Sequence, residues 1–558
     1  MTNEKDRGVL LVAGGPAGLV EALESLVHPD TLVKVVRLDL SLTDAEILPL
    51  VDCPGQLLIL LSADPDRDQG KRWLSRACRI LDRSPTARVV LHSSLDVYGP
   101  DHHSVGMVGE DAERRPALSN ARAEFWEELE AGVRETVPSD RLLILRSAHV
   151  IGKWADGWFN RLLQQHRALT VMGYDPSIQL IHEMDFVRSV HVAIEKNLTG
   201  IYNIATCDAL PLHKVLKAAK VRCFTLPWTF LRLVGCRRSG EGKASSTVAR
   251  LAYFRHSCTG CGKRFAGETD VTLSTIRALE QFVGDGGKGT EESLDLVDYS
   301  DCHGLDAPFI RRAAEGRLKF FEKIYFRVAH RGLEHIPEQG PAILVGPHRG
   351  FMPLDAVMVV QMITKYRKRV PRFLLHPSLV KMGVLARFMR RMGGVIACRK
   401  NAGEVLQRGE LLGIFPEGIR GSFKYYKDVY KLGSFGRPDY ARFALEHSVT
   451  VIPFVMVGCA EIYPIFGKLN WRWVQRGLEW PCLPITPTFP FFLLPLPTKW
   501  HLQVLPPVDP VAAIAEAERT GREPYQVIAG KVKKAIEDAT AEMLAKRKSL
   551  FLGNVFPE

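Results

Sequence analysis

Long hydrophobic runs are missing from this chain of 558 residues. No stretch reaches the roughly 18 consecutive apolar residues that a membrane-spanning helix requires. The first residues, MTNEKDRG, are charged, and the apolar run after them is only as long as a strand, so we expect no secretory signal. The 11 cysteines are scattered without the spacing of a disulfide framework, which predicts a reducing cytoplasm.

The first half of the chain has no excess of basic residues. Residues 1–300 hold 36 Lys and Arg against 39 Asp and Glu, a net charge of −3, whereas residues 301–558 hold 38 against 23, a net charge of +15. A basic surface suits nucleic acid, an anionic membrane or a phosphorylated substrate. No zinc-finger spacing and no RNA-recognition motif accompanies the charge, so we expect no nucleic-acid partner and favour the other two.

Apolar strands and helices alternate in both halves, which predicts two α/β domains. The first half contains a strand entering a Gly-rich turn (RGVLLVAGG), a helix (AGLVEALESL), and four buried parallel strands (LVKVVRLDLS, QLLILLSA, ARVVLHSS, RLLILRSA). The stretch 284–307 is Gly-rich and acidic and has little periodicity. We therefore predict a linker at 284–309 between a first domain over 1–283 and a second over 310–558.

The second half follows the same alternation. It predicts a helix over 311–329, then strands at AILVG, LLGIFPEG and TVIPFVMVG, and a final amphipathic helix at YQVIAGKVKKAIEDATAEML. The apolar segment 482–500 carries five prolines and cannot form a regular helix. It is either a membrane-interface patch rimmed by tryptophans or a loop packed on the domain; the tryptophans are Trp471, Trp473, Trp480 and Trp500.

A histidine and a carboxylate flank the turn in VGPHRGFMPLDAV (345–357). Pro353 suits the first turn of a helix, where the helix dipole favours an ionised Asp355. Gly350 lets the loop fold back, so that the carboxylate reaches one imidazole nitrogen of His348 and leaves the other to accept a proton. Taken alone, the spacing favours a plain turn over a site.

A second motif, GIFPEGIRGSFKYYK (413–427), follows a strand and joins glycines with closely spaced cations, as phosphate binding requires, although a solvated basic loop would look alike. Together with the His/Asp loop, it resembles the glycerophosphate (lysophospholipid) acyltransferase superfamily over roughly 310–545. The four ordered blocks of that family correspond to HRGFMPLD, GGVIACRKNAGEVLQRG, FPEG and VIPFVMVGCAE. The first block has six residues between His348 and Asp355 where the commonest pattern has four, which resembles the branch related to monoacylglycerol acyltransferases.

This resemblance implies an α/β acyltransferase domain that passes an acyl group from acyl-CoA or acyl-carrier protein to a glycerolipid-type hydroxyl. His348 would be the general base and Asp355 would hold it; neither a metal nor a cofactor is implied. The substrate-binding set would be Arg399, Phe415, Pro416, Glu417, Gly418, Arg420 and Lys424. With the basic charge, the resemblance predicts a peripheral or monotopic protein on the inner, anionic face of a membrane. A non-enzymatic scaffold is the competing interpretation, and the intact motifs oppose it.

In the first half, LLVAGGPAGLVEAL places Gly14, Gly15 and Gly18 between a strand and a helix, the usual place of a pyrophosphate. With LHSSLDVYG, LLILRSAHVIG and DFVRSVHVAIEKNLTGIYNIA, it resembles the extended short-chain dehydrogenase/reductase superfamily over about 8–283. That resemblance implies a Rossmann-like, doubly wound parallel sheet and an NAD(P) site. The Tyr-x3-Lys of that family reads Leu118-x3-Arg122 here, so that only Ser94 of its catalytic trio remains.

Three interpretations of the first half stay open: an NAD(P)-dependent reductase or epimerase in a bifunctional enzyme, a nucleotide binder without catalysis, or a structural or regulatory remnant. We favour the last, because leucine cannot transfer a proton. Val20 stands where the last glycine of the fingerprint belongs, and one strand, LVKVVRLDLS, stands where the family has two, which leaves Asp39 ambiguous as a ribose ligand.

The pair Cys258 and Cys261 forms a lone Cys-x2-Cys. Zinc would need two further ligands, and no second pair stands nearby in the sequence, so we expect no metal site.

Overall fold

The structure is a computed structural model that divides into two compact units, Met1–Gly304 and Leu305–Glu558, described here one at a time. The division falls inside the predicted linker 284–309. The residues that the structure describes are 8–13, 17–26, 33–38, 55–59, 88–100, 106–112, 120–228, 230–231, 250–285, 301, 303–380, 383–433, 435, 438–472, 480–487 and 495–556.

The first unit is built on a six-stranded sheet in which all neighbouring strands are parallel. The predicted apolar runs form β1 to β5. In spatial order the strands are β10 (Gly200–Ile204), β5 (Leu142–Ser147), β4 (Arg88–Ser94), β3 (Gly55–Ile59), β1 (Gly8–Ala13) and β2 (Val33–Leu38). Among the described strands only β2 lies beyond β1, which agrees with one strand where the dehydrogenase pattern has two.

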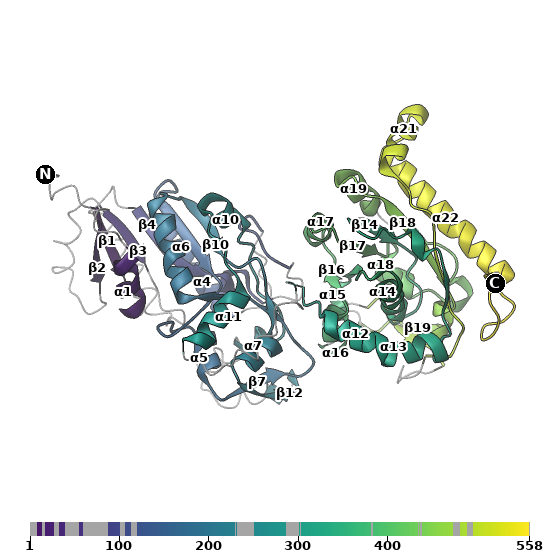
Figure 1. Ribbon diagram of the computed structural model, residues 1–558, viewed down its shortest axis with the longest axis horizontal. Helices are drawn as coiled ribbons and strands as arrows, with labels where there is room; N and C mark the ends of the chain where they lie inside the picture. The colour runs from purple at the N-terminus through teal and green to yellow at the C-terminus, as the bar shows by residue number, and fades with distance from the viewer. Residues whose placement is uncertain are drawn as a thin grey trace. The chain divides into compact units, whose positions relative to one another are not determined.

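Helices cover both faces of this sheet (Figure 1). The described helices of the unit are α1 (Ala17–Leu26), α4 (Ala121–Thr136), α5 (Trp158–Gln164), α6 (Glu183–Glu195), α7 (Leu212–Ala218), α10 (Lys263–Thr269) and α11 (Thr275–Gly284). Leu143 and Leu145 of β5 pack with α1 and α6. Since successive strand residues face opposite ways, Arg146 points to the other face, where it meets Glu130 of α4. The unit is therefore doubly wound, as predicted.

A smaller lobe with its own apolar core completes the first unit. It contains three two-stranded sheets. They pair β6 (His149–Ile151) with β9 (Leu180–His182), β7 (Arg167–Val171) with β12 (Arg222–Leu226), and β8 (Ser177–Ile178) with β11 (Leu210–Pro211).

The second unit is built on a seven-stranded sheet that is parallel except where β21 pairs with β18. The predicted strands AILVG, LLGIF and TVIPFVMVG are β14, β17 and β18. In spatial order the strands are β13 (Ala329–Arg331), β21 (His501–Val504), β18 (Val451–Val457), β14 (Ala342–Val345), β17 (Leu411–Ile414), β15 (Arg372–Leu375) and β16 (Val395–Ile396). A separate hairpin pairs β19 (Gly467–Leu469) with β20 (Leu483–Ile485).

The helix predicted over 311–329 is wrong as one continuous element. It divides into α12 (Ala307–Glu315), α13 (Arg317–Phe320) and a π-helical turn, η4 (Phe321–Tyr325), before β13 begins. Gly316 caps α12 with φ −102° and ψ −110°, outside the helical region, because glycine resists helix continuation.

The remaining helices cover the second sheet. They are α14 (Leu354–Arg367), α15 (Pro377–Val380), α16 (Gly383–Arg391), α17 (Arg399–Gln407), α18 (Gly418–Ser422), α19 (Asp439–Glu446), α21 (Pro510–Thr520) and α22 (Pro524–Lys546). The last is the predicted amphipathic helix, whose apolar side packs on β18 and α19. Among the described helices, none combines the length and apolarity needed to cross a bilayer.

The tryptophans around 482–500 do not rim one exposed patch, contrary to that interpretation. Trp500 is fully buried and stacks on Phe326 with ring centroids 4.1 Å apart, and Trp480 is also in the core. Trp471 is 62% exposed, and Trp473 lies outside the described residues. Trp500 and Trp480 therefore pack against core aromatic rings instead of reaching an exposed surface.

The ion pair of Arg146 with Glu130 is buried, so breaking it should lower the stability of the first unit. Arg146→Met leaves the Glu130 carboxylate buried, with the hydroxyl of Ser93 and the partly exposed Arg134 among its remaining contacts. We expect the free energy of unfolding of the first unit to fall by about 3 kcal/mol. Urea denaturation followed by tryptophan fluorescence measures it. Arg134→Met, the matched control, removes an exposed partner of the same carboxylate and should cost about 0.5 kcal/mol; equal losses would contradict the assignment.

Candidate active site

The loop after β14 carries the predicted histidine, and the first turn of α14 carries the predicted carboxylate. Pro353 is the N-cap of α14, so Asp355 lies in its first turn, as expected. Gly350 has a φ of +106°, a backbone conformation that favours glycine, and the loop folds back there. His348 Nδ1 lies 2.8 Å from Asp355 Oδ2, so the structure brings the pair together across the six intervening residues.

Asp355 is fixed from several sides. Its buried Oδ2 also accepts the backbone N–H of Arg349 at 3.0 Å, and its Oδ1 accepts that of Ala356 at 2.8 Å. Because a carboxylate only accepts hydrogen bonds, Nδ1 of His348 carries the hydrogen that it donates to Asp355. In the neutral ring, Nε2 then holds the lone pair and is the atom that can take a proton.

The electrostatic surroundings favour a protonated His348. Burial lowers the pKa of His348, but the charge and hydrogen bond of Asp355 and the charge of Glu417 outweigh burial and raise the pKa above its ordinary value. The imidazole also stacks on Phe415, with ring centroids 4.7 Å apart and an interplanar angle of 18°. The ring is therefore held in one orientation and readily accepts a proton.

His348 opens onto an apolar pocket of about 720 Å³, its open mouth included. The walls come from the His348 loop, α14, the end of β15, α15, α16 and the loop 415–423. Beside His348, the lining residues are Phe351, Met352, Pro353, Ala356, Phe373, Leu374, Leu375, His376, Leu379, Leu385, Met389, Phe415, Gly418, Ile419, Ser422, Phe423 and Trp480. A mostly aliphatic and aromatic cavity of this size accommodates a hydrocarbon chain.

The FPEG motif divides between pocket and scaffold. Phe415 and Gly418 line the pocket, and Pro416, which lies between the two in the sequence, is half-buried. Glu417 turns away, forms an ion pair with Lys424, and accepts the backbone N–H of Gly433 at 2.7 Å. A buried carboxylate needs such partners. Glu417 and Lys424 therefore hold the loop closed, and neither stands in the pocket as the predicted substrate-binding set required.

Of the predicted cations, Arg399 lies outside the pocket lining and Arg420 is exposed. Arg399 is 68% exposed, pairs with Glu446 at 2.8 Å and does not line the pocket. It follows β16, which stands three strand positions from β14, roughly 14 Å at about 4.8 Å per step. The structure therefore does not bring Arg399 to this pocket, and its substrate-binding role stays a prediction. Arg420 lies exposed on α18, beside the lining residues Gly418 and Ile419.

His376, which was not among the predicted site residues, also lines this pocket. Its Nδ1 faces the Ser378 hydroxyl at 2.8 Å and accepts the Ser378 backbone N–H at 3.2 Å. The available signal was its position directly after the strand RFLL, because parallel strands bring their carboxyl ends to one edge of a sheet.

The first unit has a separate apolar pocket, whose lining includes Ser94, Arg122 and Trp158. Ser94 accepts the Asp96 backbone N–H at 3.1 Å, and Arg122 pairs with the buried carboxylate of Asp96 at 2.8 Å. Both predicted positions are therefore engaged within the protein. Leu118 and Asp39 lie outside the described residues.

In the described residues, an indole occupies the place where a dinucleotide would approach the first helix. Gly18, in the first turn of α1, faces the Trp154 indole so closely that a Cβ there would lie 2.4 Å from two ring atoms. This glycine makes room for the indole where a pyrophosphate would approach the helix. Gly14 and Gly15, the other predicted contacts, lie outside the described residues.

Cys258 is a thiol directed at the protein backbone. Its Sγ lies 3.1 Å from the Leu95 carbonyl oxygen, and burial raises its pKa well above the ordinary value. No three His, Cys, Asp or Glu side chains gather around a common centre in the part of the chain that the structure describes.

Comparison with known proteins identifies the second unit. A family model described as Acyltransferase matches residues 327–457, which contain the His348 loop, FPEG and β18. An uncharacterised protein of Mycobacterium leprae is 32% identical over 326 residues, 57% of this chain and 86% of that protein. An uncharacterised protein of Mycobacterium tuberculosis is 31% identical, over 52% of this chain and 82% of that protein. A Bos taurus protein named "DGAT1/2-independent enzyme synthesizing storage lipids" is 27% identical, over 34% of this chain and 55% of that protein.

Solved structures match half of the chain at low identity. A dTDP-glucose 4,6-dehydratase of Bacillus anthracis covers 51% of this chain and 98% of its own, at 13% identity and a TM-score of 0.36. A dTDP-4-dehydrorhamnose reductase of the same organism covers 50% and 99%, at 14% identity and a TM-score of 0.38. The fold of the first unit rests on its own strand order.

The raised pKa of His348 gives a prediction with a definite sign. Because the base must be neutral, kcat/KM should fall as the pH drops through the raised pKa. Asp355→Asn removes the main charge that raises this pKa, so the acid limb should move to lower pH while kcat falls about 10²- to 10⁴-fold. A pH profile of kcat/KM measures both. Asp439→Asn, an exposed carboxylate of the same unit, should leave the profile unchanged; an unmoved limb in Asp355→Asn would contradict the assignment.

Proposed function

This chain belongs to the acyltransferase family, and we propose that it transfers a fatty acyl group from acyl-CoA or acyl-carrier protein to a hydroxyl of a glycerolipid-type acceptor. The observation that carries the proposal is the His348–Asp355 pair at the mouth of an apolar pocket. A base beside a hydrocarbon-sized cavity suits a reaction between a hydroxyl and a lipid thioester.

The chemistry needs one base and no covalent intermediate. Nε2 of His348 takes the proton of the acceptor hydroxyl as its oxygen attacks the thioester carbonyl carbon. A C–O bond forms and the C–S bond breaks, and the leaving thiolate takes the proton back from the imidazolium. Asp355 accepts the Nδ1 hydrogen throughout and stabilises the transient positive charge.

The acyl chain is assigned to the apolar pocket. Phe415 belongs to both parts of the site, since its ring stacks on His348 and on Phe373 of the pocket wall, 5.1 Å away. An acyl chain lying along these rings would bring its carbonyl carbon to the histidine and exclude water from the reacting groups.

The acceptor head group is assigned to the open side of loop 415–423. Arg420 is the predicted cation that stays exposed there, whereas Lys424 is engaged with Glu417. A guanidinium can bind a phosphate through two hydrogen bonds, which suits an acceptor such as 1-acylglycerol 3-phosphate.

We also assign the protein to an anionic membrane surface on the cytoplasmic side, bound peripherally. Three apolar side chains on η4, α13 and α16, Ile324, Phe320 and Val384, are 64%, 47% and 73% exposed. Basic residues of the same elements accompany them, Arg317, Lys319 and Lys323 among them. In Figure 1, α12, α13, α16 and β19 lie along one edge of the second unit. Since α16 also supplies Leu385 and Met389 to the pocket, a bilayer at this edge would deliver acyl chains to it.

The first unit is assigned a structural or regulatory role without redox or epimerase chemistry. Arg122 is engaged with Asp96, and Trp154 lies against Gly18. Both contacts support this assignment over the bifunctional alternative.

Loss of the base tests the proposed activity in cells. Membranes from cells expressing the wild type should contain acylated glycerolipids that are absent from cells expressing His348→Ala, because the variant lacks the base of the proposed reaction. Lipid mass spectrometry measures the profile. His447→Ala, a histidine of α19's C-terminus outside the pocket, is the control and should match the wild type. Identical profiles for the wild type and His348→Ala would contradict the proposal.

Vesicle flotation tests the membrane edge. The triple variant Phe320→Ser, Ile324→Ser and Val384→Ser should bind phosphatidylglycerol vesicles about tenfold more weakly or worse, because it removes the apolar contacts. The control, Val511→Ser with Ile514→Ser on α21, removes comparably exposed apolar side chains at the opposite edge in Figure 1 and should bind normally. Equal binding by both variants, or no wild-type binding, would contradict this surface.

A further inference from the structure

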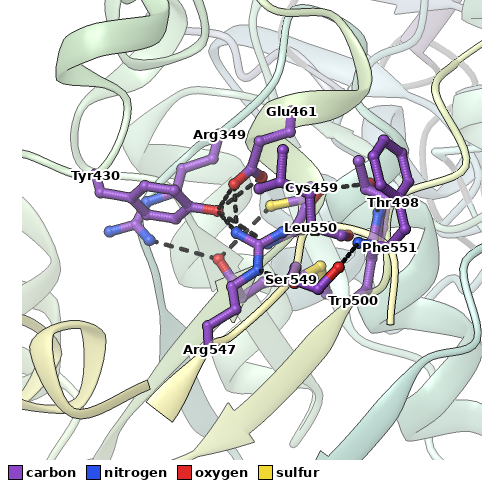
Figure 2. A network of polar contacts seen from close by, with 12 residues as sticks. Arg349, Tyr430, Cys459, Glu461, Thr498, Trp500, Arg547, Ser549, Leu550 and Phe551 are labelled. Atoms are coloured by element: carbon purple, nitrogen blue, oxygen red, sulfur yellow. Dashed lines mark hydrogen bonds and ion pairs between the residues drawn. The ribbon is translucent and has the colours of Figure 1, made fainter. Parts of the chain in front are cut away.

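Arg349, the residue after the base, has a side chain that nothing in the proposed chemistry uses. It is only 2% exposed, and its guanidinium carbon lies 4.8 Å from the ring centroid of Tyr430. Figure 2 shows the two side chains together, with the Tyr430 hydroxyl surrounded by polar partners. A guanidinium over an aromatic face is attracted by the ring, and more strongly where water is excluded.

The burial of this guanidinium is poorly compensated. Its hydrogen bonds to the Met456 carbonyl and the Thr540 hydroxyl are long, at 3.5 and 3.4 Å, and its Nε has no hydrogen-bond partner among the described residues. Within that part of the chain, no carboxylate stands at ion-pair distance from it. An apolar side chain would avoid this cost, so packing alone does not explain an arginine here.

Tyr430 is held far more firmly than the arginine that it faces. Its hydroxyl lies 2.6 and 2.7 Å from the two carboxylate oxygens of Glu461, to which it donates. It accepts the backbone N–H of Gly458 at 3.0 Å and a hydrogen from Arg547 at 3.2 Å. Burial raises the pKa of Tyr430 well above its ordinary value, so the phenol stays neutral and its ring stays anchored.

The stacked pair joins the two loops that build the active site. Arg349 lies in the His348 loop, and Tyr430 ends the segment that begins with FPEG. The backbone N–H of Arg349 also donates to Asp355 Oδ2, the oxygen that holds His348. A shift of the Arg349 side chain therefore moves an amide that orients the carboxylate, and through it the imidazole.

We propose that Arg349 and Tyr430 are positioning residues for the acyl-transfer reaction, whose stacked side chains hold the His348 loop in register with the FPEG loop. The Glu461–Arg547 ion pair anchors the tyrosine (Figure 2), so Arg547, at the end of α22, takes part in this support. The proposal rests on the proposed function, since the reaction being positioned is acyl transfer.

Variants of the tyrosine separate the ring from its hydroxyl. Tyr430→Leu removes the stacking surface and should lower kcat about 100-fold with KM within threefold, because a misplaced base loses rate without losing substrate. Tyr430→Phe keeps the ring and should stay within about fivefold of the wild type. The double variant Arg349→Met with Tyr430→Leu should lose no more than Tyr430→Leu alone, because the two residues act as one unit.

A matched control separates positioning from stability. Tyr440 is a fully buried tyrosine of the same unit whose hydroxyl has no partner among the described residues. Tyr440→Leu should lower the melting temperature and leave kcat per folded molecule unchanged. The proposal is overturned if Tyr430→Leu behaves in that same way, or if Tyr430→Phe loses as much kcat as Tyr430→Leu.

A second readout needs no turnover and stands if the proposed function fails. Carbethoxylation of His348 by diethyl pyrocarbonate, followed by peptide mass spectrometry, reports how the imidazole is held. The rate at His348 should rise several-fold in Tyr430→Leu and stay near the wild-type rate in Tyr430→Phe and Tyr440→Leu. An unchanged rate in Tyr430→Leu overturns the positioning role, whereas absent acyl transfer with a changed rate overturns the proposed function alone.

Discussion

The hydrogen bond between His348 and Asp355 is the contact on which the rest of the second unit depends. It forms because β14 ends in a loop that folds back at Gly350 onto the first turn of α14. The neighbouring parallel strand β17 then delivers Phe415 to the same edge of the sheet, where its ring stacks on the imidazole. The ends of the neighbouring strands β14 and β17 therefore bring together the base, its carboxylate and one wall of the pocket.

Buried charge surrounds this contact, and its distribution explains the roles of the nearby residues. Glu417 is neutralised by Lys424, yet its charge still reaches His348 and helps to raise the pKa of that histidine. Arg349 has no carboxylate partner among the described residues, and its guanidinium lies over the ring of Tyr430. The ion pair of Glu417 with Lys424 thus holds this loop together. The stacking of Arg349 on Tyr430 joins the loop to the residue after His348. Of the cations of this loop that were predicted to bind substrate, Lys424 pairs with Glu417 and Arg420 is exposed.

Local signals predicted much of this arrangement, and long-range pairing accounts for what they missed. Continuous apolar runs predicted β1 to β5, β14, β17 and β18, whereas β10, β13, β15, β16 and β21 were not predicted. The Pro353 signal predicted the helix that carries Asp355. The position of Arg399 depends on the order of strands in the sheet, which no local pattern contains. The ion pair of Glu417 with Lys424 depends on how a loop closes. The stacking of Arg349 on Tyr430 depends on tertiary packing. Tertiary packing also buries Trp480 and Trp500, which one interpretation had placed at a membrane interface.

The central claim is that the acyl group passes directly from donor to acceptor, with His348 as the base. A rapid-quench single turnover of the purified full-length protein with a radiolabelled acyl thioester and a lysophosphatidic acid acceptor tests it most directly. The account predicts that label leaves the thioester and enters the acceptor ester at one rate, that none becomes bound to protein, and that His348→Gln abolishes both changes. Label bound covalently to the protein before product appears, or equal transfer by His348→Gln, would contradict it.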